Sequence, residues 1–389
     1  MPRSIRHAIP ILLALVSSLG AEAPRALPVD PSEITPDSGL RPVEPAPAAP
    51  EAKPLPPGEV KLPEPEKNPR SDTPDIDNLP TGEDAVRLQI FLDEQHFGPG
   101  VIDGKPGRFT ILAVNSWNEV NGHPKDDLGP VMAAARRAVP SPFATAIVPE
   151  VAAKWVNTGL SYKRSQQANA KRMSYRSYGE FMSERYHTDV EFLVEINGSK
   201  PVYGLAPRKS LIVPNVKPFL VENLTGSRYE TEPLLASRHV VVDTKVNQAR
   251  IYENAPTALV VGDDPDGPVQ VRANRSLIAA FPITPGQERF IKYGLWEMRN
   301  AVQLPVWRYD QSLLDGKGRS NNAINIPPGP NSPVGVIWMG LSVSGIGIHG
   351  TSDPETIGRS RSAGCIRMAN WDAMRLPDFV RPGASVEIR

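Results

Sequence analysis

The chain contains one cysteine, Cys365, and its neighbours are typical of a reactive thiol. It lies in the segment Ser-Ala-Gly-Cys-Ile-Arg-Met, and His349 precedes it in the segment Ile-His-Gly-Thr. The thiolate is the nucleophilic form of cysteine, and a nearby imidazole can generate it by accepting the thiol proton. Gly364 and Gly350, which flank the two side chains, allow close backbone approach. This pattern predicts that Cys365 is a nucleophile and that His349 is its base.

A free cysteine is also often a small buried hydrophobic residue, and Cys365 alone does not separate the two interpretations. The start of the chain favours a reactive thiol, because residues 1–23 have the pattern of a signal peptide. Basic residues precede an apolar run, and Ala-Glu-Ala at 21–23 is a candidate cleavage site. An exported protein with one cysteine cannot form an internal disulfide. An uncleaved anchor stays open as an alternative, although the apolar run is short for a membrane span.

Three segments around these residues resemble the YkuD-type L,D-transpeptidases of bacterial cell walls. They are Ile-His-Gly-Thr-Ser at 348–352, Glu-Thr-Ile-Gly at 355–358 and Ser-Ala-Gly-Cys-Ile-Arg-Met at 362–368. The flanks at 326–335 and 381–386 also agree, so the resemblance covers about 238–389. One residue departs from the family pattern: the family usually has histidine directly before Gly-Cys, and this chain has Ala363.

The resemblance implies an acyl transfer through a thioester on Cys365. The implied substrate is a peptidoglycan stem tetrapeptide, cleaved between its L-centred third residue and the terminal D-Ala. The acyl group would pass to an amine of another stem, to a wall-attached protein or to water, and carbapenems would acylate the same thiol. Backbone N–H groups at Gly364 and Cys365 are the natural donors to the oxyanion. A backbone carbonyl near Gly350 or Thr351 is the local candidate to orient the His349 ring.

Further residues are candidates for substrate binding. Arg367 could bind a substrate carboxylate or hold the loop, and the alternative is a surface arginine. Ser362 and Thr351 can shape the loop through side-chain bonds to the backbone. Asn331 is a candidate cleft residue, whereas Trp338 is expected in the core.

The composition excludes some classes of partner. Lys and Arg together equal Asp and Glu in number, so net charge gives no reason to expect a nucleic acid. His96, His123, His187 and His239 have no cysteine or carboxylate cluster of metal-ligand form around them. We therefore expect no metal and no cofactor.

The amino-terminal half is expected to consist of a linker and small modules. Residues 24–80 are rich in proline and lack aromatic residues, which predicts a disordered linker. Residues 82–122 read as two helices around a Gly-rich turn and resemble peptidoglycan-binding modules through Ile-Asp-Gly at 102–104. Residues 123–173 are interpreted as a connector with helical pieces. A purely structural helical hairpin is the alternative for the first module.

Residues 174–218 read as strand or turn, helix, helix and strand, and end in Val-Pro-Asn, which resembles a LysM module. A plain structural domain is the alternative. From residue 238 the apolar pattern alternates, with strands expected near 239–243, 248–252, 258–261, 279–283, 335–339 and 346–348. A helix is expected over 371–380, although Pro377 interrupts it. The predicted fold class is multidomain: a mostly-β YkuD-like catalytic domain over 238–389, a sandwich or barrel, preceded by small helical and α+β wall-binding modules.

Three functions are compatible with this sequence. The first is an exported L,D-transpeptidase of the periplasm or cell envelope whose partner is peptidoglycan. The second is a catalytically weak wall-binding protein, which Ala363 would favour. The third is a thiol hydrolase that trims wall peptides with the same residues.

Overall fold

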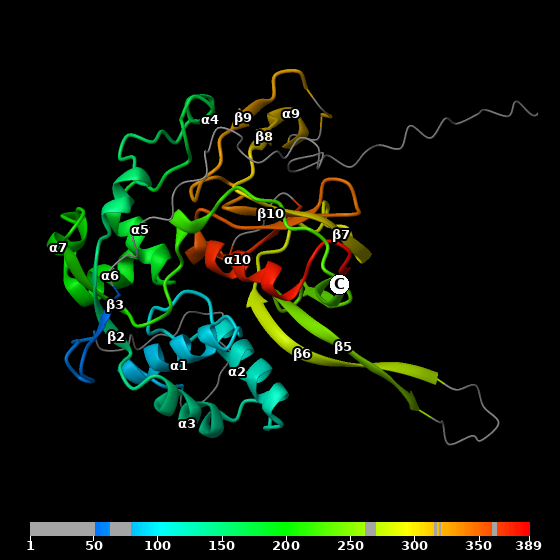
Figure 1. Cartoon of the computed structure of the whole chain (residues 1–389), viewed down its shortest axis with the longest axis horizontal. Coiled ribbons are helices and arrows are strands. Elements are labelled where there is room, and N and C mark those ends of the chain that lie inside the picture. The colour runs from blue at the N-terminus through cyan, green and yellow to red at the C-terminus, as the bar shows by residue number, and fades with distance from the viewer. Residues whose placement is uncertain (1–50, 63–78, 261–269, 315–316, 319, 360–363) are drawn as a thin grey trace, which may run out of the picture.

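The computed structural model describes residues 51–62, 79–260, 270–314, 317–318, 320–359 and 364–389 (Figure 1). The predicted signal peptide and most of the predicted linker lie outside these residues. No helix in the described part of the chain is long and apolar enough to cross a membrane.

Three helices form the first packed unit: α1 (Gly82–Glu94), α2 (Arg108–Asn121) and α3 (Leu128–Ala138). The first two confirm the predicted helical pair, and α1 buries an apolar face that includes Leu88 and Leu92. The predicted turn between them is held by Gln89, whose side chain donates to Asp103 (2.9 Å) and accepts from the backbone N–H of Gly104 (2.8 Å). Gly104 has a φ of 68°, which favours glycine.

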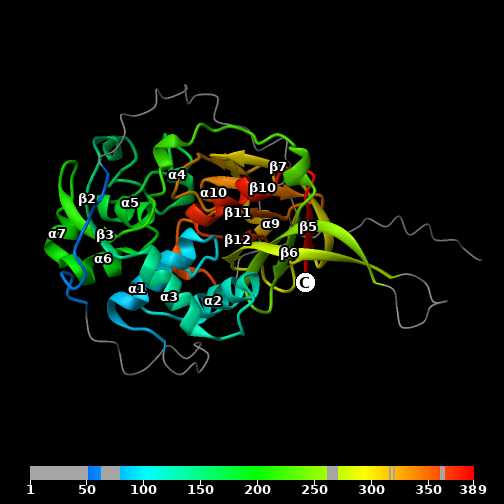
Figure 2. The same ribbon diagram turned by 60° about the horizontal axis from the view of Figure 1, so that its bottom comes forward.

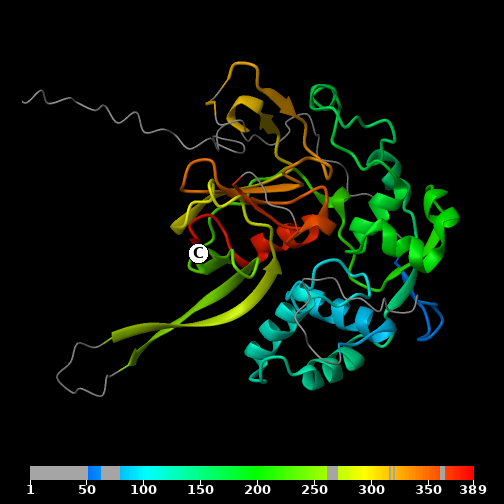
Figure 3. The same cartoon turned by 180° about the vertical axis from the view of Figure 1, so that it is seen from behind.

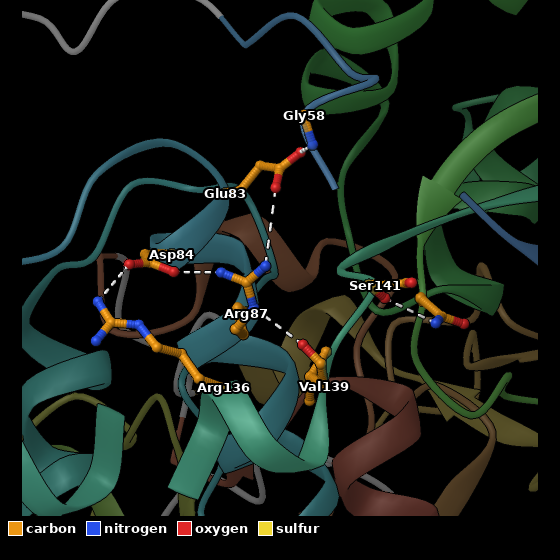
Figure 4. A network of polar contacts seen from close by, with 8 residues as sticks. Gly58, Glu83, Asp84, Arg87, Arg136, Val139 and Ser141 are labelled. Carbon is orange, nitrogen blue, oxygen red and sulfur yellow. Dashed lines mark hydrogen bonds and ion pairs between the residues drawn. The ribbon is translucent and has the colours of Figure 1, made fainter. Parts of the chain in front are cut away.

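The first part of residues 123–173, interpreted as a connector with helical pieces, forms the helix α3. The helix α3 packs against α1 and α2, so the helical unit extends beyond residue 122. Buried Val131 and Ala135 provide the apolar contact. Arg87 of α1 donates to the carbonyl of Val139 (2.9 Å), and Arg136 of α3 pairs with Asp84 (Figure 4).

A second unit combines a small sheet with short helices. Its elements are β2 (Phe143–Ile147), the 3-10 turn η1 (Glu150–Lys154), α4 (Arg164–Gln167), α5 (Tyr178–Arg185), α6 (Val190–Asn197), α7 (Ser199–Tyr203) and β3 (Ser210–Pro214). The two predicted helices and the last strand of the LysM-like segment are present as α5, α6 and β3. The segment before α5, expected as a strand or a turn, forms no named strand, and β3 pairs antiparallel with β2, which lies in the predicted connector.

The prediction that residues 24–80 are disordered does not hold for residues 51–62, which the structure describes and which include a short strand. The strand β1 (Lys53–Pro54) joins the edge of β2, with Lys53 opposite Thr145. Proline is tolerated there because an edge strand leaves one side of its backbone unpaired. Val60 is buried, and the N–H of Gly58 donates to the carboxylate of Glu83 at 2.5 Å (Figure 4). Main-chain pairing and one apolar anchor therefore order a short piece of a proline-rich segment.

The carboxy-terminal half is built on one eight-stranded sheet with the order β12-β11-β10-β7-β13-β4-β5-β6. Its strands are β4 (His239–Asp243), β5 (Gln248–Val260), β6 (Gln270–Pro282), β7 (Gly294–Gln303), β10 (Ile337–Leu341), β11 (Gly347–His349), β12 (Ile366–Arg367) and β13 (Ser385–Ile388). The remaining elements are η2 (Val221–Asn223), α8 (Pro233–Ala236), β8 (Trp307–Tyr309), α9 (Gln311–Leu314), β9 (Ile324–Ile326), η3 (Pro354–Thr356) and α10 (Asn370–Phe379). This arrangement confirms the mostly-β expectation for this part of the chain.

The sheet curls until its two ends meet beside the cysteine. Thr284, just after β6, exchanges two backbone hydrogen bonds of 2.9 Å with Arg367 on β12. The strand β12 therefore has neighbours on both sides, β11 and the end of β6. Figure 2 shows β10, β11 and β12 next to one another, with α10 beside them, and α10 packs against β10 and β11.

The predicted strands at 248–252 and 258–261 are one strand. β5 runs without a break through the expected turn, and it pairs with β6 in a long hairpin that projects from the body (Figure 3). The pairing register shifts near Tyr252 and between Asn254 and Thr257, where the apolar alternation is irregular and suggested a turn. β-Bulges of this kind break the period of two without ending a strand.

Candidate active site

Strand register places the predicted nucleophile and base on the same face of the sheet. β11 and β12 run parallel, with Ile348 opposite Ile366 and His349 opposite Arg367. Side chains alternate along a strand, so His349, Arg367 and the adjoining Cys365 point to one face. Ile348 and Ile366 point to the other face and belong to the main core of the sheet. The sheet therefore separates the reactive side chains from the core that supports them.

The ring of His349 is fixed by one hydrogen bond and one aromatic contact. Its Nδ1 lies 2.6 Å from the carbonyl oxygen of Gly350, so Nδ1 carries the proton. The ring stacks on Trp338 of β10 with centroids 5.7 Å apart and planes at 19°. Nε2 is buried and has no hydrogen-bond partner among the described residues. This tautomer leaves the Nε2 lone pair available to accept a proton.

Burial sets the charge state of both groups. Desolvation lowers the pKa of His349 to about 3, the charge of Arg367 lowers it further, and the bond to Gly350 opposes this shift. Desolvation raises the pKa of Cys365 to about 12, against a small opposite effect of the Gly347 backbone. The thiol lies 3.5 Å from the carbonyl of Gly345, to which it can donate. At neutral pH the resting pair is a neutral thiol and a neutral imidazole, rather than a thiolate and an imidazolium.

Two positions near the cysteine require glycine: Gly364, which directly precedes it, and Gly286, which packs against Gly364 from another segment. Gly364 has a φ of 139°, a conformation that other residues rarely adopt. Gly286 lies directly against it, because a Cβ built on Gly286 would be 2.3 Å from the Gly364 Cα. The close approach that the sequence predicted at Gly364 is therefore present. The assignment of the Gly364 and Cys365 N–H groups as oxyanion donors stays a prediction.

The other candidates differ in their surroundings. Thr351 is buried, and its hydroxyl accepts from the N–H of Asp353 (3.3 Å), which supports the predicted role in shaping the loop. Arg367 is half-buried, and burial lowers its pKa while the charge of Asp353 raises it. Ser362 and Ala363 lie outside the described residues. Substrate binding by these residues stays a prediction.

Asn331 is buried and tied to the amino-terminal half of the chain. Its amide donates to the carbonyl of Ser174 (2.9 Å), and its N–H donates to the carbonyl of Met173 (2.9 Å). It also lines a cavity of about 520 Å³ between α5 and the loop that follows β11. Tyr162, Glu180 and Glu355 line the same cavity, whereas Cys365 does not. Asn331 therefore joins two parts of the protein, and its predicted position in the cleft of the thiol stays a prediction.

Residues from distant segments cover the face of the sheet that carries Cys365. The sequence analysis did not predict this cover. Cys365 and Trp338 share an apolar cluster with Leu160, Met173, Trp307 and Ile326. Leu160 and Met173 come from the predicted connector, Trp307 comes from β8 and Ile326 comes from β9. The thiol is completely buried beneath this cluster. The stacking of Trp338 on His349 was not predicted either. The alternation in 335–339 and 346–348 predicted two strands, but only their pairing shows that these two residues lie opposite each other.

Among the described residues, no group of three or more His, Cys, Asp or Glu side chains is arranged to hold a metal ion. The groups that the site offers for chemistry are the Cys365 thiol, the His349 imidazole and backbone donors. Together these groups could carry an acyl transfer in which the imidazole accepts the thiol proton.

Comparison with known proteins finds a family to which the carboxy-terminal part of the chain is similar. Residues 258–388 match the YkuD family model, the L,D-transpeptidase catalytic domain. Over 65 residues the chain is 45% identical to "Putative L,D-transpeptidase YkuD" of Bacillus licheniformis, a match that covers 17% of this chain and 39% of that protein. The protein of the same name from Bacillus subtilis is also 45% identical over 65 residues, which cover 17% of this chain and 40% of that protein.

The chain thus spans about two fifths of the length of these curated relatives. Among solved structures, an L,D-transpeptidase from Mycobacterium smegmatis aligns over 48% of this chain and 75% of its own, with 12% identity and a TM-score of 0.28. The family match begins at residue 258, inside β5, although β4 and the start of β5 belong to the same sheet. Residues 258–388 are thus similar to the L,D-transpeptidase catalytic domain of the YkuD family.

Proposed function

We propose that this protein is an L,D-transpeptidase that acts on peptidoglycan stem tetrapeptides. The observation that carries the proposal is the position of Cys365 and His349 on one sheet face inside the segment that matches this family. A buried thiol beside a neutral imidazole with a free Nε2 lone pair is suited to proton transfer during the attack itself.

The proposed reaction has two halves. The Cys365 sulfur attacks the carbonyl before the terminal D-Ala while His349 Nε2 accepts the thiol proton. The C–N bond breaks, the departing D-Ala amine takes the proton from the imidazolium, and a thioester remains on Cys365. An acceptor amine then attacks the thioester, loses its proton to His349 and forms the new amide, and the proton returns to the thiolate.

The acceptor is proposed to be an amine of another stem, which gives a 3→3 crosslink, or an amine of a wall-attached protein. We also propose that residues 82–122 and 174–218 bind the wall. For residues 82–122, the support is the turn at Asp103 and Gly104, which Gln89 holds through hydrogen bonds. For residues 174–218, the support is the presence of the helices α5 and α6 before β3. The signal-peptide pattern of residues 1–23 supports export to the periplasm or cell envelope.

A catalytically weak wall-binding protein is the second candidate. Two observations favour it: the thiol is completely buried with a raised pKa, and Ala363 stands where the family usually has histidine. In this case the YkuD-type domain would keep its fold without efficient acylation. A thiol hydrolase would use the same residues with water as the acceptor.

Intact-mass spectrometry after incubation with a carbapenem tests the proposal. We expect a mass gain of one drug molecule on the parent chain, no gain on Cys365→Ala and a much slower gain on His349→Ala. Product analysis with stem tetrapeptides, with and without an added amine, then separates transfer from hydrolysis. A folded parent that never gains the drug would reject the transpeptidase and favour the wall-binding protein.

A further inference from the structure

Asn370, the first residue of α10, lies against the backbone that orients the catalytic base. Its side chain is completely buried between Gly335 and Gly350. A Cβ built on either glycine would lie 2.1 Å from the Asn370 Oδ1, so the amide is in direct contact with both backbones. Oδ1 also accepts from the N–H of Val336 (3.1 Å). The Asn370 side chain therefore sets where the backbone at Gly350 can lie.

The other end of the Asn370 amide is held by a residue far away in the sequence. Nδ2 donates to Glu184 Oε1 at 2.5 Å and to the carbonyl of Pro330 at 3.3 Å. Glu184 lies on α5, outside the segment that matches the family, and its side chain is buried. Its second oxygen accepts the hydroxyl proton of Tyr175. Both carboxyl oxygens are thus used, and Glu184 has one fixed position.

These contacts form a continuous chain to the base. Glu184 holds the Asn370 amide, the amide packs on Gly350, and the Gly350 carbonyl accepts the proton of His349 Nδ1 at 2.6 Å. That last bond fixes the tautomer, so a shift of the Gly350 carbonyl would turn the ring or move its proton. Hydrogen-bond partners behind a histidine commonly control its orientation in this way.

We propose that Glu184 is a positioning residue for His349, acting through Asn370 and Gly350. The expected effect on acylation rates rests on the proposed transpeptidase function. The orientation of the His349 ring can be measured without that function. It gives the LysM-like segment a second role: besides any contact with the wall, its helix α5 completes the catalytic site. The catalytic segment alone would then have a poorly oriented base.

Rates of acylation by a carbapenem test this role. Glu184→Ala leaves the Asn370 amide without its partner, and we expect the maximal acylation rate to fall at least about 10-fold, since small misplacements of a catalytic group can cost about 10²-fold. The carbapenem concentration for half-maximal rate should change little, because Glu184 does not lie at the thiol. Glu184→Gln keeps an oxygen for Asn370 and should restore the rate to within about 3-fold of the parent.

Glu222→Gln is the matched control. Glu222 forms a buried ion pair with Arg185, the next residue on α5, at 2.8 Å, so its loss also disturbs this helix. We expect Glu222→Gln to lower the melting temperature and leave the acylation rate unchanged. Equal rate losses in Glu222→Gln and Glu184→Ala at equal thermal shifts would overturn the proposal, as would a folded Glu184→Ala variant that acylates at the parental rate.

NMR of ¹⁵N-histidine-labelled full-length protein provides the second readout. The Nδ1–H proton of His349 should exchange slowly with water in the parent and in Glu222→Gln, and its signal should be lost in Glu184→Ala. If the parent is not acylated at all, the transpeptidase proposal fails while this signal still decides the role of Glu184. A parental signal in Glu184→Ala would refute it. If that variant does not fold, Tyr175→Phe removes one donor to Glu184, and an unchanged rate and signal there would refute it as well.

Discussion

Arg375 on α10 holds the carboxylate of Asp93 on α1 through two hydrogen bonds, from Nη2 to Oδ2 at 2.7 Å and from Nη1 to Oδ1 at 3.0 Å. His187, in the turn between α5 and α6, lies 3.0 Å from the same carboxylate and stacks on Trp371. Burial alone would raise the pKa of Asp93, but Arg375 and His187 outweigh it and hold the pKa below its usual value. One buried carboxylate thus joins the first helix, the second unit and the helix behind the catalytic strands.

Removal of this carboxylate should strongly destabilise the protein. Asp93→Ala leaves Arg375 buried without its main partner, and we expect the free energy of unfolding to fall by about 3–5 kcal/mol. Urea unfolding followed by circular dichroism measures the change. Arg208→Ala removes a largely exposed pair with Glu150 and should have little effect. Similar losses in both variants would show that the buried network has no special importance.

The raised pKa of Cys365 predicts slow alkylation at neutral pH. Because the folded thiol has a pKa of about 12, the thiolate is scarce, and iodoacetamide should modify it at least about 10²-fold more slowly than an unhindered thiol with a pKa of about 8.5. The rate should still rise between about pH 8 and about pH 10. A mass-spectrometric time course measures it, with urea-unfolded protein as the control. Fast alkylation that levels off near pH 7 would contradict a neutral resting pair.

Thr284 is expected to support the loop around the nucleophile. It is completely buried, its backbone pairs with Arg367, and its hydroxyl accepts from the N–H of Gly358 at 2.8 Å. Thr284→Val leaves that N–H without its acceptor and should cost about 1–3 kcal/mol of stability and slow acylation. Thr284→Ser keeps the hydroxyl and should keep the rate. A Thr284→Val variant that acylates like the parent would show that the loop does not need this bond.

Glu184 should make stability depend on pH. Burial raises its folded pKa to about 8, while an unfolded glutamate has a pKa of about 4.3. Between these values the folded state binds a proton that the unfolded state has lost, so a rise in pH destabilises the parent. Glu184→Gln removes this effect, and its stability relative to the parent should rise by roughly 1–4 kcal/mol from about pH 5 to about pH 8. Urea unfolding at several pH values measures the difference, and a constant difference would contradict the raised pKa.

Local patterns in the sequence were sufficient for much of the fold. Alternating apolar residues predicted β4, β10 and β11, and helical spacing predicted α1 and α2. They failed where the pattern is irregular or the partner is distant. The bulged strand β5 was interpreted as two strands, and the pairing of β3 with β2, across the helices α4 to α7, was not expected.

The sequence by itself determined which residues could do chemistry: one cysteine, a histidine with glycine beside it, and the alternation that places His349 on one face of a strand. Only the tertiary structure decided their state. The apolar cover from Leu160 and Met173 buries the thiol, and the contact from Glu184 through Asn370 reaches the base. The physical reason is that pKa and orientation depend on desolvation and on partners brought together by packing, and neither can be read from a local sequence pattern.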